Sequence, residues 1–196
     1  MKRLFVLPVL ALALVAMSFA LVGTDYKVDA GASNIVWNGY KVTGAHTGNV
    51  KVKTGKLVMD DGKLTGGNFE IDMSSITCTD MSGGGADKLV GHLKSDDFFG
   101  VATYPVAKFS ITRAIPTDTK GNYKIVGNLT IKATTKEIKF NANVTETNGE
   151  AKATGKITID RSEFDVRYGS GSFFDSLGDK TIYDEFDLNV SLVAKK

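Results

Sequence analysis

An alternation of apolar and polar residues recurs along most of this chain and constrains its fold more than any other feature. Successive side chains of a β-strand point to opposite faces, so such a run buries one face and exposes the other. In the clearest run, apolar residues and one glycine occupy every second position from Tyr123 to Ile131. Comparable runs cover residues 35–40, 50–53, 67–73, 107–112, 138–144, 151–159 and 186–192. We therefore expect an all-β protein of about eight strands.

Short turn signals separate these runs and favour antiparallel pairing of neighbouring strands. Asp60-Asp61-Gly62 and Asn148-Gly149 are typical of tight hairpins, because glycine readily adopts the positive φ that such turns need. Residues 118–121 and 133–136 are also expected to turn the chain. The predicted topology is thus a series of hairpins.

Long antiparallel strands with one apolar face must bury that face. An eight-stranded closed barrel does so and also removes unpaired edges, whereas two stacked sheets are the alternative arrangement. We favour the barrel because several runs are long, and because glycines lie within strand patterns, where curvature often requires them: Gly39, Gly67, Gly127 and Gly155.

The segment from Gly91 to Ile111 interrupts the strand pattern and is expected to close the barrel. Before it, the glycine-rich stretch Ser82–Gly85 lacks the spacing of a phosphate-binding loop and is interpreted as a flexible approach. Leu89 and Leu93 then share one side of a short helical pattern. The sequence predicts a helical insert near residues 86–98.

The first 20 residues resemble a secretory signal peptide. Lys2 and Arg3 precede an apolar run, and small residues lead to an expected cleavage near Ala20; an uncleaved membrane anchor is the alternative. Residues 21–196 would then form one domain, located in the periplasm or secreted. Of the 24 Lys and Arg residues, two belong to the signal, so the rest balance the 22 acidic residues. This neutrality argues against nucleic acid as a partner.

Neither catalysis nor metal binding is indicated. His46 and His92 lie in different local patterns, and the acidic pairs Asp60-Asp61 and Asp96-Asp97 fall in turn-like segments. No serine has the context of a nucleophile elbow. The single cysteine, Cys78, excludes an intrachain disulfide and is interpreted as a buried small apolar residue. We expect no catalytic residues, no metal site and no enzyme activity.

Four blocks resemble, in order, the YceI-like family of exported, lipocalin-like, polyisoprenoid-binding proteins. They are the run from Trp37 to Gly48, His92-Leu93-Lys94-Ser95-x-Asp97-Phe98-Phe99 with Tyr104-Pro105 and Phe109, the run from Gly127 to Lys136, and Asp160-Arg161-x-x-Phe164 with the strand 182–193. The resemblance implies an antiparallel barrel that holds a polyprenyl chain or the tail of an isoprenoid quinone, with no other cofactor.

An eight-stranded barrel is either filled by its side chains or encloses a slender ligand, and periodicity alone leaves both open. If a tunnel exists, the inward-facing residues expected to line it are Phe69, Ile71, Phe109, Ile111, Leu129, Ile131 and Phe140. The candidates for a polar mouth that receives the head group are Trp37, Lys41, His46, His92, Lys94 and Tyr104.

The expected function is that of an exported carrier for an isoprenoid lipid, making transient contact with a membrane or a membrane protein. The alternative is a partner-binding module for a membrane redox protein, without a carrier role. The sequence assigns no oligomeric state.

Overall fold

The computed structural model describes residues 23–196, and more than half of this part of the chain belongs to one antiparallel sheet. Its strands are β1 (Thr24–Val28), β2 (Asn34–Lys41), β3 (Gly44–Asp60), β4 (Lys63–Asp72), β5 (Val106–Pro116), β6 (Asn122–Ile131), β7 (Thr134–Thr147), β8 (Glu150–Asp160) and β9 (Ile182–Lys195). The helical elements are η1 (Met73–Ser75), α1 (Gly84–Lys94), η2 (Arg161–Phe164) and η3 (Gly178–Lys180).

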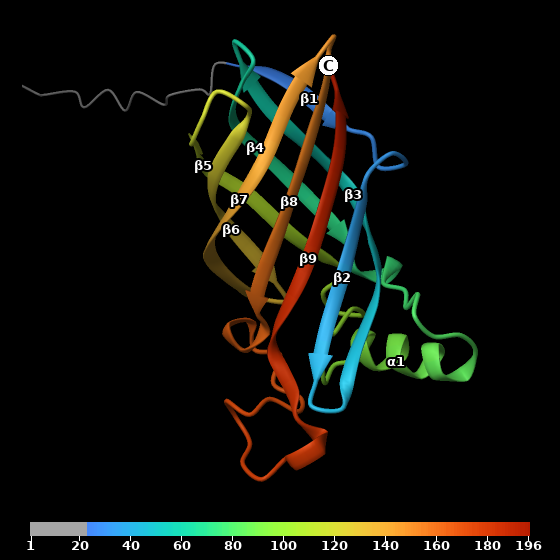
Figure 1. The fold of residues 1–196 in the computed structure, drawn as a ribbon. Coiled ribbons are helices and arrows are strands. Elements are labelled where there is room, and N and C mark those ends of the chain that lie inside the picture. The colour runs from blue at the N-terminus through green and yellow to red at the C-terminus, as the bar shows by residue number, and fades with distance from the viewer. Residues whose placement is uncertain (1–22) are drawn as a thin grey trace, which may run out of the picture.

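The sheet closes on itself (Figure 1). Each strand from β2 to β9 pairs with its neighbour in sequence, and β2 pairs with β9. The wall of the barrel therefore has eight strand positions, which we call staves. The short β1 also pairs with β3 and β9, beyond the end of β2, so β1 and β2 share one position in the wall. The predicted eight-stranded antiparallel barrel is confirmed, and the alternative of two stacked sheets is excluded.

The hairpin turns show which local signals were informative. Asp61 and Gly62 have φ of 46° and 72°, and Asn148 and Gly149 have 53° and 80°, as two-residue hairpins require. The turn expected at residues 133–136 lies earlier, because Lys132 adopts a φ of 54° and β7 already begins at Thr134. The adjacent threonines are β-branched and favour a strand, which explains the error.

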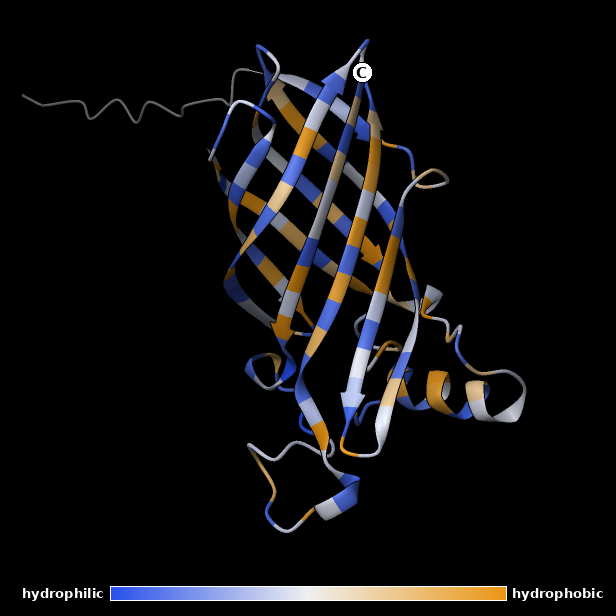
Figure 2. Cartoon of the chain, in the orientation of Figure 1, coloured by the Kyte–Doolittle hydropathy of each residue, from blue (hydrophilic) through white to orange (hydrophobic). Residues whose placement is uncertain are grey.

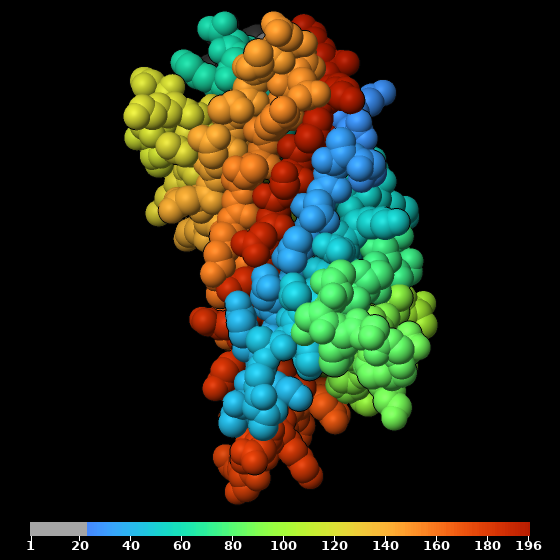
Figure 3. Space-filling view, turned by 45° about the vertical axis from the view of Figure 1, so that its right-hand side comes forward, coloured from blue at the N-terminus to red at the C-terminus, as the bar shows by residue number. Residues whose placement is uncertain are grey.

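Helix α1 lies outside the barrel wall, at the end that also holds the β2–β3 turn and the loop 165–181 (Figures 1 and 3). The predicted insert is present, but the helix ends at Lys94. Ser95 then begins a compact turn in which its carbonyl accepts the backbone N–H groups of Phe98 and Gly100. We call this end of the barrel the α1 end.

The opposite end is closed by tight packing. Ala151 and Ala194 are completely buried there, and the Tyr123 hydroxyl accepts a hydrogen bond from the backbone N–H of Leu64 at 3.1 Å. Along the staves, apolar and polar residues alternate between the two faces of the wall (Figure 2). The apolar faces point inward and form one core cluster that extends along the barrel.

Within residues 23–196, no helix has the length and apolar character needed to cross a membrane. The predicted signal peptide, with its cleavage near Ala20, lies outside the described residues and stays a prediction.

Candidate functional site

The barrel encloses two apolar cavities. The first, of about 140 Å³, lies toward the α1 end, and the second, of about 110 Å³, lies deeper. Both expose only apolar surface to the enclosed space. They are neighbours because five residues line both: Ile35, Ile71, Leu129, Ile159 and Leu188. The interior is therefore neither a solid core nor a wide tube, but two small apolar spaces separated by a ring of aliphatic side chains.

All seven residues predicted to line a tunnel lie on these cavities. Ile131 lines the first cavity, Ile71 and Leu129 line both, and the second cavity is lined by Phe69, Phe109, Ile111 and Phe140. Their placement follows from strand parity, since each occupies an inward position of its strand. That they contact a lipid stays a prediction.

Three phenylalanine rings occupy the second cavity. The centroids of Phe69 and Phe109 lie 6.4 Å apart, and those of Phe109 and Phe140 lie 5.6 Å apart. A Cβ at Gly127 would lie only 2.4 Å from the Phe109 ring. Glycine in β6 therefore makes room for an aromatic side chain from β5, a packing reason that differs from the curvature expected from sequence.

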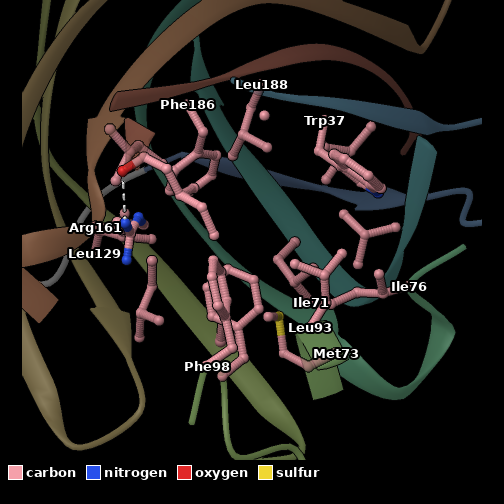
Figure 4. Close-up of a pocket in the computed structure, with 18 of the residues that line it drawn as sticks. Trp37, Ile71, Met73, Ile76, Leu93, Phe98, Leu129, Arg161, Phe186 and Leu188 are labelled. Atoms are coloured by element: carbon pink, nitrogen blue, oxygen red, sulfur yellow. Dashed lines mark hydrogen bonds between the residues drawn. The ribbon is translucent and has the colours of Figure 1, made fainter. Parts of the chain in front are cut away.

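The first cavity is capped by the segment that follows α1. Leu93, in the last turn of α1, and Phe98 line it from below, facing Phe186 and Leu188 of β9 (Figure 4). Phe99 also lines this cavity. Phe98 is buried and its ring meets that of Phe99 edge-on, with centroids 5.0 Å apart. The segment from Gly91 to Ile111 does close one end of the barrel, through apolar side chains.

Arg161 also lines the first cavity, although sequence reasoning did not assign it a role in the site (Figure 4). Its side chain is only 2% exposed. It donates hydrogen bonds to the backbone carbonyls of Val166, Ile182 and Tyr183 at 2.6, 2.9 and 3.2 Å. These carbonyls stand at the two ends of the loop 165–181. Arg161 therefore fastens the base of this loop and turns its donors away from the cavity.

Charge and aromatic contacts compensate for the burial of this guanidinium. Desolvation lowers the pKa of Arg161, and the carboxylates of Asp184 and Asp160 oppose that shift. Asp184 Oδ1 lies 3.2 Å from Arg161 Nη2, outside hydrogen-bonding geometry, so the attraction is electrostatic. The Phe98 ring lies 5.3 Å from the guanidinium carbon. In the sequence, the block Asp160-Arg161-x-x-Phe164 was the available signal for a role of Arg161, but it was interpreted only as part of the family resemblance.

The six residues predicted for a polar mouth do not form one site. Only Trp37 lines a cavity, and its indole N–H donates to the Thr77 carbonyl at 3.0 Å. The rings of His92 and Tyr168 meet edge-on at 4.3 Å, and the Nε2 atom of His92 is buried with no partner in the described part of the chain. Three others lie outside both linings: Lys41, exposed at the tip of β2, and the half-buried Lys94 and Tyr104. The cap of the first cavity consists of apolar side chains, so the charged residues predicted for the mouth lie outside it.

His46, the sixth candidate, belongs to a polar cluster with Asp80 and Cys78. Its Nδ1 lies 3.0 Å from Asp80 Oδ2, and the Cys78 thiol donates to Asp80 Oδ1 at 3.1 Å. These hydrogen bonds lower the pKa of Asp80 to about 2, and the one from the Cys78 thiol has the larger effect. Burial raises the pKa of Cys78, and Asp80 raises it further. Cys78 is half-buried with a polar partner, so its interpretation as a buried apolar residue was wrong.

A closed eight-stranded antiparallel sheet around an apolar interior defines a lipocalin-like barrel. The model of the YceI-like domain matches residues 26–194, and this chain belongs to that family.

A curated relative and several solved structures are similar to this chain. A UPF0312 protein of Shewanella denitrificans is 30% identical over 89 residues, which are 45% of this chain and 44% of that protein. The chain thus spans less than half the length of this relative in the match.

Three solved structures illustrate the shared fold. BcnA of Burkholderia cenocepacia has a TM-score of 0.70 at 23% identity, covering 86% of this chain and 99% of that one. A polyisoprenoid binding domain from Saccharophagus degradans has a TM-score of 0.65 at 16% identity, with 87% and 97% covered. The YceI protein of Campylobacter jejuni has 0.56 at 21%, with 74% and 82% covered. At these identities the likeness shows the fold.

Proposed function

We propose that this chain binds the hydrocarbon chain of an isoprenoid lipid inside the barrel and carries it outside the cytoplasm. The observation that carries the proposal is the pair of adjoining cavities with wholly apolar linings. Each CH₂ group transferred from water to such surroundings contributes about 0.8 kcal/mol, so a long chain has a strong preference for the barrel over water. The polyisoprenoid binding described for the Saccharophagus degradans domain supports the ligand class.

The cavity linings also bear on how the ligand would be oriented. Neither cavity exposes polar surface, and Arg161 directs its donors to backbone carbonyls. A buried head group would lose its hydrogen bonds to water without replacement, at a cost of several kcal/mol. The head group therefore stays outside, with the predicted polar residues at the α1 end as candidate contacts. Export is supported by the signal-like pattern of the first 20 residues.

The direct test is organic extraction of the purified protein followed by mass spectrometry. A stoichiometric isoprenoid supports the carrier, and an empty protein contradicts it. The matched variants are Phe109→Asp, which places a carboxylate on the second cavity, and Lys124→Asp, which places one on the exposed face of β6. We expect folded Phe109→Asp to lose the lipid and Lys124→Asp to keep it. Equal lipid content in both variants contradicts the assignment of the cavity.

One further observation favours contact with a membrane or a membrane protein. Five of the exposed large apolar residues belong to segments at the α1 end, namely the β2–β3 turn, the loop 165–181 and the start of β9: Val42, Tyr168, Phe173, Phe174 and Tyr183. The backbone N–H of Val42 donates to the Thr181 carbonyl at 3.2 Å, which holds the β2–β3 turn beside the loop 165–181. As a carrier, the protein would use this patch in lipid transfer; as a module for a membrane redox protein, it would bind the partner there without any lipid. An empty extract together with partner binding favours the second function.

A further inference from the structure

The barrel wall is not paired along its whole length. Strands β7 and β8 are hydrogen-bonded only where residues 142–147 meet residues 150–155. Below this point residues 134–141 of β7 pair with β6 alone, and residues 156–160 of β8 pair with β9 alone. Figure 1 shows the two strands diverging from their common end. We call this stretch, between residues 134–141 and 156–160, the unpaired seam.

The two edges of the unpaired seam carry polar backbone groups that no neighbouring strand satisfies. Among the described residues, no backbone hydrogen bond joins these edges to each other or to a third segment. Backbone N–H and C=O groups without protein partners are satisfied by water. The seam is therefore a hydrated part of the wall. The pairing of β4 with β5 also stops short, at Gly67 and Ile111, but there the buried Leu64 and Tyr123 fill the gap, and the Leu64 N–H donates to the Tyr123 hydroxyl.

The second cavity lies directly behind the unpaired seam. Ile138 and Phe140 on one edge and Ile157 on the other line this cavity, and all three are half-buried. Where the strands part, the wall is thin, because Ala142 and Gly155 also line the cavity. The outward positions of the same edges are polar and exposed, and they include Glu137, Lys139, Asn141, Lys156 and Thr158.

Packing determines how far the seam extends. A Cβ at Gly155 would lie 3.1 Å from the Asn141 carbonyl oxygen, so glycine permits the close crossing at which the strands separate. At the other end, Phe164 of η2 and the nearby Val166 are almost completely buried, and the Lys132 ammonium donates to the Asp165 carbonyl at 3.0 Å. The unpaired seam is thus limited at one end by the close contact of Gly155 with Asn141 and at the other by the buried residues in and after η2.

Both ends of the barrel are closed more firmly than this seam. The far end is packed around fully buried alanines, and the α1 end is capped by the buried Phe98 and fastened by Arg161. A ligand entering at the far end would have to displace buried side chains, and one entering through the cap of the first cavity would have to displace the buried Phe98. Along the seam, three side chains that line the second cavity, Ile138, Phe140 and Ile157, are only half-buried, although Ile159 on the same β8 edge is buried.

We propose that the hydrocarbon chain of the ligand enters and leaves the barrel sideways, through the unpaired seam, and not through either end. This inference rests on the proposed function. The chemistry of the seam fits the passage of a linear apolar chain: the inner edges are aliphatic and aromatic, and the outer edges carry charged and hydroxyl groups that remain in water.

The test is to bridge the seam and measure exchange rates. In a Cys78→Ser background, which removes the single native thiol, Lys139→Cys and Lys156→Cys place thiols on opposite outer edges and are joined by a bis-maleimide. The control pair, Asn128→Cys with Glu137→Cys, occupies partner positions of the continuous β6–β7 ladder and is bridged in the same way. Mass spectrometry verifies each bridge, and circular dichroism verifies the fold.

The probe is retinol, a fluorescent isoprenoid alcohol, mixed with delipidated protein in a stopped-flow instrument. We expect the seam bridge to slow both association and dissociation by at least tenfold, roughly equally, so that the dissociation constant changes little. The control bridge should change either rate by less than twofold. Unchanged rates with the seam bridge overturn the sideways route while leaving the proposed function intact. Absence of retinol binding by the unbridged parent overturns both.

Discussion

Replacing Arg161 with methionine should destabilise the protein more than any other single change at the α1 end. The substitution keeps a long side chain but removes three hydrogen bonds and the positive charge beside Asp184. Removing one partner of a buried ion pair typically costs about 3–5 kcal/mol, because the remaining groups are left without compensation. The fully buried position of Arg161 places the expected loss within this range.

The measurement is equilibrium urea unfolding followed by circular dichroism. With a slope of about 2 kcal/mol per molar urea, the expected loss moves the midpoint down by about 1.5–2.5 M. The matched control is Arg167→Met, because Arg167 contacts Asp165 on the surface and its side chain is 58% exposed. Exposed ion pairs are screened by water, so the control midpoint should move by no more than about 0.5 M.

A double variant separates the unpaired charge from the lost hydrogen bonds. Arg161→Met combined with Asp184→Asn removes the carboxylate that the single change leaves without its cation. We expect the double variant to recover about 1 kcal/mol or more of the loss, as coupled neighbours do. The reasoning is refuted if Arg161→Met shifts the midpoint no more than Arg167→Met does.

Two other predictions concern pH and packing. Because the folded-state pKa of Asp80 is about 2, below its ordinary value of 3.8, the stability that it contributes is complete above pH 4 and is lost as the pH falls toward 2. Asp80→Asn should therefore flatten the decline in melting temperature between pH 4 and 2, and an unchanged acid profile would count against this assignment. Gly127→Ala should cost about 1–3 kcal/mol in urea unfolding, because its Cβ would meet the Phe109 ring at 2.4 Å. The matched change Gly91→Ala, in open space on α1, should instead stabilise by about 0.5–1 kcal/mol, and the reverse order would refute the packing argument.

The parts of the fold that follow from side-chain period were predictable from sequence. Inward positions of a strand recur at every second residue, so the cavity-lining residues could be named before the structure was known. Features that depend on packing between distant segments were not predictable. The positive φ of Lys132 has no local signal, and the parting of β7 from β8 depends on a close approach of Asn141 to Gly155. The separation of the residues predicted for a polar mouth had no local signal either, because it depends on how the cap packs on the barrel; that they contact a head group stays a prediction.

The size of the cavities determines what must move when a chain binds. Each is close to the engineered cavity of about 150 Å³ that accommodates one benzene molecule, which is roughly the size of one isoprene unit. A longer chain needs space that Phe69, Phe109 and Phe140 now occupy. Widening the wall would break hydrogen-bonded ladders, whereas rotating a ring only exchanges one apolar contact for another. Phe109 and Phe140 are half-buried, and Phe140 lies on the edge of the unpaired seam with its ring centroid 5.6 Å from that of Phe109. We therefore expect rotation of these two rings, rather than expansion of the barrel, to set the length of chain that the interior can take.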